Sequence, residues 1–171
     1  MEETLNPLDV LLDARKYNPE YKPSQDQILW TIHDKHIIAT TMNFQILTGM
    51  PKAGKSTFLS ALISTVFTPS GLWGMKLNLP PDRRKIAYFD TESSDYDFYR
   101  QVERIKKFAG INGIPEWCSL FTVREDEPKA ILAMVEHYLK TSNAPIVILD
   151  GLLDLIFDYN DPIESRKLIK Y

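Results

Sequence analysis

The feature that most constrains this chain is an eight-residue motif at residues 49–56, which fits the pattern G-x-x-x-x-G-K-[ST] at every position. An apolar run at residues 44–48 precedes the motif, and apolar residues at helical spacing follow it. In this strand–loop–helix context, small residues let backbone N–H groups wrap phosphate oxygens, and the helix N-terminus adds positive potential. The motif therefore predicts a phosphate-binding loop. The alternative is a glycine turn that binds nothing.

Charge and composition narrow the class of protein. The 171 residues carry 20 Lys and Arg against 23 Asp and Glu, a formal net charge of −3, which argues against a broad nucleic-acid-binding coat but leaves room for a local basic patch. No apolar run approaches the roughly 18 residues that a membrane helix needs, and the acidic N-terminus lacks a signal-peptide profile. The single cysteine, Cys118, cannot form an internal disulfide. We therefore expect a cytoplasmic protein without a membrane partner.

Short apolar runs alternate with amphipathic stretches along the chain, which predicts an α/β fold: a mostly parallel sheet with helices on both faces. The proline- and glycine-containing stretch at residues 69–84 is expected to be a surface excursion. Residues 1–27 are expected to form an N-terminal helix and linker, and residues 28–171 the main domain. The expected strands are 28–32, 36–40, 44–48, 85–90, 120–123 and 146–150; the expected helices are 6–16, 55–67, 95–109, one starting at 126–128 and one starting at 161.

Acidic residues follow two of the expected strands. Asp150 ends the most apolar one, and Asp90 and Glu92 end the strand after the phosphate-loop helix. Because the carboxyl ends of parallel strands meet at one edge of a sheet, these carboxylates are expected beside the loop. There Ser56 and Asp150 could hold Mg²⁺, and Glu92 could orient and deprotonate a water molecule. The alternatives are a turn-forming Asp150 before Gly151 and a solvated Glu92.

Three sequence blocks, GMPKAGKST, YFDTE and IVILDGLLDL, resemble the RecA-like P-loop ATPase superfamily, in particular the branch of DnaB-type and plasmid RepA hexameric helicases. The resemblance covers about residues 37–155. It implies ATP and Mg²⁺ as cofactors, Lys55 as a catalytic phosphate ligand, Glu92 as the catalytic base, and Ser56 and Asp150 as metal ligands. The expected nucleotide-binding residues are Gly49, Met50, Pro51, Lys52, Ala53, Gly54, Lys55, Ser56 and Thr57.

The resemblance also implies a motor that acts on single-stranded DNA in replication, recombination or mobile-element transfer, as a homo-oligomeric ring. The N-terminal helix, with its apolar Leu8, Leu11 and Leu12, could latch onto an adjacent subunit or dock on its own domain. Members of the superfamily have more core after the strand that ends in the metal-binding aspartate (the Walker B strand, residues 146–150 here). The C-terminal part of the core, with the DNA-facing loops and any arginine finger, is therefore expected to be missing from this chain.

Two other functions stay open. A P-loop kinase would need a lid, for which residues 72–84 are the candidate, and a nucleotide-dependent switch or scaffold would need only binding. A GTPase is disfavoured because the sequence has no convincing N-K-x-D motif. On the expected helix 95–109, Tyr96, Phe98 and Tyr99 could stack on a base or pack in the core. Arg104 lies on the same helix, after Glu92, where sequences of the superfamily it resembles often have an arginine, although this match is loose.

Overall fold

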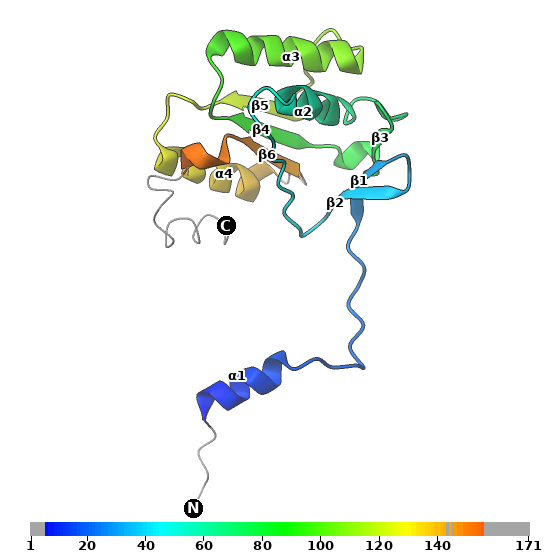
Figure 1. Ribbon diagram of the computed structural model, residues 1–171, viewed down its shortest axis with the longest axis vertical. Coiled ribbons are helices and arrows are strands. Elements are labelled where there is room, and N and C mark those ends of the chain that lie inside the picture. Colours follow the sequence, from blue (N-terminus) through cyan, green and yellow to red (C-terminus); the bar gives the residue numbers. More distant parts are fainter. Residues whose placement is uncertain (1–5, 143, 145, 156–171) are drawn as a thin grey trace, which may run out of the picture.

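The computed structural model describes residues 6–142, 144 and 146–155 (Figure 1). Its helices and strands follow the predicted order, except that the strand expected at residues 44–48 is absent, one strand is additional and two short 3₁₀ turns occur. In order they are α1 (Pro7–Arg15), β1 (Ile28–Ile32), β2 (His36–Thr40), α2 (Lys55–Ser64), β3 (Met75–Leu77), η1 (Pro81–Arg83), β4 (Ile86–Asp90), α3 (Asp95–Ala109), β5 (Cys118–Thr122), α4 (Pro128–Ser142), β6 (Ile146–Asp150) and η2 (Leu152–Leu155).

The centre of the fold is a parallel sheet in the order β5-β4-β6. All five residues of β4 are buried, because helices cover both faces of the sheet. Ile86 and Tyr88 belong to the apolar cluster that includes α2 and α3, whereas Ala87 and Phe89 belong to the cluster that includes α4. Figure 1 shows the same layers, with α2 and α3 on one side of the sheet and α4 on the other. The α/β prediction, with helices on both faces of a parallel sheet, is confirmed.

A second, antiparallel sheet has the order β2-β1-β3. Its third strand lies in residues 69–84, so the prediction of a surface excursion there is wrong. Met75, Leu77 and Leu79 are each exposed by no more than 3%. The glycines Gly71 and Gly74 both adopt positive φ values, and the turns they form bring β3 back against β1. Glycines that indicate a loop thus form turns that return a strand to the core.

The predicted strand at residues 44–48 is also wrong, because the structure has no strand there. Phe44 and Ile46 are 76% and 75% exposed. An apolar run becomes a strand only when a neighbouring strand accepts its backbone hydrogen bonds, and no strand in the described part of the chain pairs with this one. The loop that follows is therefore reached through an extended, solvent-exposed segment.

Local signals at the helix ends are confirmed. Asn6 accepts a hydrogen bond from the Leu8 N–H at 3.0 Å, and Ser94 accepts one from the Asp97 N–H at 3.2 Å. Gly110 ends α3 in the left-handed conformation, at φ 67°.

Helix α1 has no buried residue and lies apart from the other elements, beyond an extended segment (Figure 1). The helix expected at residue 161 lies outside the described residues, and every helix within them is too short or too polar to span a lipid bilayer.

One buried hydrogen bond joins the antiparallel sheet to the end of α2: the Trp30 Nε1–H donates to Thr65 Oγ1 at 2.8 Å. Trp30→Phe removes this donor and part of the ring, so we expect a loss of about 1–3 kcal/mol in the free energy of unfolding, measured by denaturant titration. Trp73, which is 58% exposed and forms a T-shaped ring pair with Phe108, supplies the matched control. Trp73→Phe should change stability by less than about 0.5 kcal/mol, and equal losses in both variants would contradict the assignment.

Candidate active site

The loop at residues 49–54 is exposed and ends in a backbone conformation that opens the N-terminus of α2. Gly54, at φ 88°, stands at the N-cap position, where no side chain caps the helix. Lys52 also adopts a positive φ, 63°. Successive turns of this kind direct backbone N–H groups toward one concavity, which suits an anion. The Lys55 Nζ donates to the Gly49 carbonyl at 3.0 Å and so spans the loop. The loop therefore has the donors and the positive charge that a polyphosphate needs.

The two acidic strand ends lie together, as predicted. In the parallel pairing of β4 with β6, Asp90 is the register partner of Asp150. Burial raises the pKa of Asp150, and the negative charge of Asp90 raises it further, whereas the Tyr88 hydrogen bond and the charge of Lys55 lower it. The influence of Lys55 on Asp150 indicates that the phosphate loop and the end of β6 face the same space.

Glu92 lies just beyond β4, with its side chain exposed. Partial burial and the charges of Asp150, Asp154 and Asp90 raise its pKa, and Lys55 lowers it. Its backbone is fixed by Asp90, whose Oδ1 accepts the N–H groups of Glu92 at 3.0 Å and Ser93 at 2.8 Å. Asp90 is only 1% exposed. The structure thus distinguishes two acids that are two positions apart: Asp90 is buried and fixes the turn, and the side chain of Glu92 is exposed.

Several polar residues of the site carry no sequence motif. The Tyr88 hydroxyl lies 3.0 Å from Asp90 Oδ2 and 2.9 Å from Asp150 Oδ2, and Gln101 Nε2 donates to it at 2.8 Å. The Thr91 hydroxyl lies 2.7 Å from Asp154 Oδ2 and 3.0 Å from the carbonyls of Asp150 and Gly151. The available signal was weak: a tyrosine inside an apolar strand, and a glutamine on the buried stripe of a helix.

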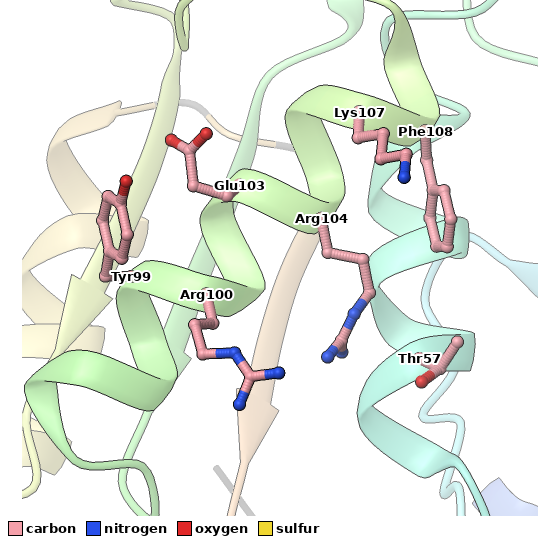
Figure 2. Close-up of a pocket in the computed structure, with 7 residues that line it drawn as sticks. All are labelled: Thr57, Tyr99, Arg100, Glu103, Arg104, Lys107 and Phe108. Carbon is pink, nitrogen blue, oxygen red and sulfur yellow. The ribbon is translucent and has the colours of Figure 1, made fainter.

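A groove between α2 and α3 lies beside the first turn of α2. Figure 2 shows cationic side chains of α3 reaching toward Thr57 of α2. Among the described residues, none of these cations forms an ion pair. Phe98 stacks on Tyr88 in the core, whereas Tyr96 and Tyr99 are exposed, so only the tyrosines are free to meet a base. The groove is lined by Thr57, Tyr99, Arg100, Glu103, Arg104, Lys107 and Phe108.

The donor set suits a magnesium ion that arrives with a nucleotide. Ser56, exposed in the first turn of α2, and Asp150 offer hard oxygen ligands. No group of three or more His, Cys, Asp or Glu side chains within the described ranges forms a metal cage. Mg²⁺ commonly takes one or two protein ligands and completes its shell with phosphates and water, so the residues fit that ion.

Burial raises the pKa of Cys118 to about 12, which argues against a thiol nucleophile.

A glycine-rich phosphate loop beside acidic strand ends defines a P-loop nucleotide-dependent ATPase. The family model described as "AAA domain" matches residues 5–161, which is most of the chain. The protein belongs to this family of AAA-type P-loop ATPases. No curated protein and no solved structure gives a significant match.

Gly151 follows Asp150 at φ 90°, and a Cβ there would lie 2.0 Å from Thr91 Oγ1. Gly151→Ala must therefore displace Thr91, so we expect it to lower the free energy of unfolding by more than about 2 kcal/mol, measured by denaturant titration. Gly113 has no atom within 4 Å of an added Cβ, so Gly113→Ala is the control and should stay within about 0.5 kcal/mol of the parent. A Gly151→Ala protein as stable as the control would show that this turn is not packed as described.

Proposed function

We propose that this protein is an ATP-hydrolysing, RecA-like motor module that acts on single-stranded DNA in replication, recombination or mobile-element transfer, as a relative of the DnaB/RepA-type ring helicases. The observation that carries the ATPase part is the register pairing of Asp90 with Asp150, which brings Asp150 and the turn that bears Glu92 to one edge of the sheet. The positive charge of Lys55 lowers the pKa of both Glu92 and Asp150, which agrees with a phosphate loop facing that edge. The DNA substrate rests on the resemblance of the three sequence blocks.

Each residue has a role that its position supports. The loop N–H groups and Lys55 bind the β- and γ-phosphates. Ser56 and Asp150 would hold Mg²⁺, and the ion would neutralise charge on the phosphates when bound. Glu92 orients the attacking water and accepts its proton. The raised pKa of Glu92 makes it a stronger base than an ordinary carboxylate, which suits that role.

The groove beside Thr57 offers a place for the base and ribose. Tyr99 presents an exposed ring, and Arg100 and Arg104 present guanidinium planes, and both kinds of group stack on bases. Thr57 belongs to the first turn of α2, next to the proposed metal ligand Ser56. A nucleotide with its phosphates on the loop could therefore extend its base into this groove.

The kinase alternative is less favoured. A phosphotransferase needs a segment that closes over the acceptor, and residues 72–84 were the candidate lid. β3, within this segment, pairs with β1, and Met75 and Leu77 are buried in the core. A lid anchored in this way could not open without breaking the core. A switch that binds ATP and hydrolyses it poorly is distinguished by the turnover measured below.

Two substitutions separate binding from chemistry. Glu92→Gln keeps the shape of the side chain and removes the base, so we expect ATP hydrolysis to fall by about 10²-fold or more while ATP binding is retained. Lys55→Ala removes a phosphate ligand and should weaken ATP binding or stop turnover.

Calorimetric ATP titration measures the effect on binding, and phosphate release measures the effect on hydrolysis. Glu20→Gln and Lys35→Ala, at exposed positions, are the charge-matched controls. Turnover by Glu92→Gln at the parent rate would assign the base to another residue.

Assembly is tested through α1. Its exposed Leu8, Leu11 and Leu12 lie at the end of an extended segment, which suits a latch on a neighbouring subunit. We expect the full-length protein to sediment as a ring-like homo-oligomer with ATP and Mg²⁺ present, and a form without residues 1–24 to dissociate. A monomer in both forms would rule out the latch and leave an ATPase that acts as a single subunit.

A further inference from the structure

A buried chain of hydrogen bonds runs from α3 through β4 to the acidic edge of the sheet. Gln101 Nε2 donates to the Tyr88 hydroxyl at 2.8 Å, and that hydroxyl lies 2.9 Å from Asp150 Oδ2 and 3.0 Å from Asp90 Oδ2. Tyr88 is 1% exposed and Gln101 4% exposed. These hydrogen bonds thus connect the core to the proposed metal ligand, and none of the roles proposed above uses them.

The direction of the Tyr88 O–H bond follows from the number of protons available. A phenol has one hydrogen to donate, and the Gln101 amide already occupies an acceptor position of the oxygen. The hydroxyl hydrogen therefore points to the carboxylate side. Asp90 Oδ1 receives two backbone N–H groups, whereas among the described residues Tyr88 is the one hydrogen-bond donor to the Asp150 carboxylate.

The phenol ring of Tyr88 is packed within the core. Its ring lies parallel to Phe98, with an interplanar angle of 2° and a centroid separation of 6.4 Å, and it is enclosed by the cluster of α2 and α3. A carboxylate otherwise turns freely about its last torsion, which is broad for aspartate. A fixed donor on Oδ2 limits that rotation and leaves Oδ1 of Asp150 for a ligand.

We propose that Tyr88, oriented by Gln101, is a positioning residue that holds the Asp150 carboxylate ready for the hydrated Mg²⁺ of a bound nucleotide. The proposal rests on the function proposed above, because it assumes that Asp150 serves the metal. Residues that orient a metal ligand commonly change metal affinity by about 10- to 100-fold when they are removed. The alternative is that Tyr88 only fills the core and satisfies a buried glutamine.

The test measures the binding of ADP by calorimetry over a series of Mg²⁺ concentrations, without turnover. Tyr88→Phe keeps the ring and removes the hydroxyl. We expect its metal-free ADP affinity to stay within about twofold of the parent, and the Mg²⁺ concentration that half-saturates the metal-dependent gain to rise about tenfold. Tyr138→Phe is the matched control, because it also loses a hydroxyl bond, to Ser119 Oγ at 2.9 Å, in the cluster beneath the sheet on the α4 side.

Two further variants make the outcome decisive. Gln101→Met leaves the phenol in place and should shift the Mg²⁺ requirement in the same direction by a smaller factor, which keeps the test valid if Tyr88→Phe does not fold. In an Asp150→Asn background, Tyr88→Phe should add no further shift. An unchanged Mg²⁺ requirement in Tyr88→Phe, or an equal shift in Tyr138→Phe, overturns the positioning role. Parent protein whose ADP binding ignores Mg²⁺ would overturn the proposed function instead.

Discussion

The pairing of β4 with β6 is the contact on which the site depends. Its register sets Asp90 opposite Asp150, so two carboxylates lie together at a partly buried edge. Such a placement is unfavourable unless each charge finds donors. Asp90 accepts a hydrogen bond from a backbone N–H of the next turn, and Asp150 accepts one from the Tyr88 hydroxyl. Lys55 supplies positive charge from the loop. A one-residue slip of β6 would turn Asp150 to the other face of the sheet and remove the site.

Lys55 supplies the positive charge of this arrangement. It donates to the Gly49 carbonyl and offsets the charges of Glu92 and Asp150. Under the proposed function, a triphosphate in the loop would direct the charge of Lys55 to phosphate oxygens, and the acids would then face additional negative charge. A divalent cation compensates for that charge, which is a physical reason why nucleotide and metal should bind together at this edge.

Local patterns gave reliable predictions, whereas two of the patterns that depend on a distant partner, at residues 44–48 and 75–77, did not. The helix ends at Asn6, Ser94 and Gly110 follow from the local chemistry and conformation of a few neighbouring residues. The apolar run at residues 44–48 and the strand β3 depend on whether an open sheet edge is available, which the sequence around them does not contain. The link between Tyr88 and Gln101 joins residues 13 positions apart on different elements, so no spacing rule reveals it.

Helix α3 joins the two halves of the proposed site. Gln101 and Ile105 are its buried residues, whereas Arg100 and Arg104, each one position earlier, line the groove beside Thr57. Adjacent helical residues point about 100° apart, so one rigid helix presents Gln101 to Tyr88 and Arg100 to the groove. The proposed base site and the proposed metal ligand are therefore linked to the same helix, through Arg100 on one side and through the hydrogen bond from Gln101 to Tyr88 on the other.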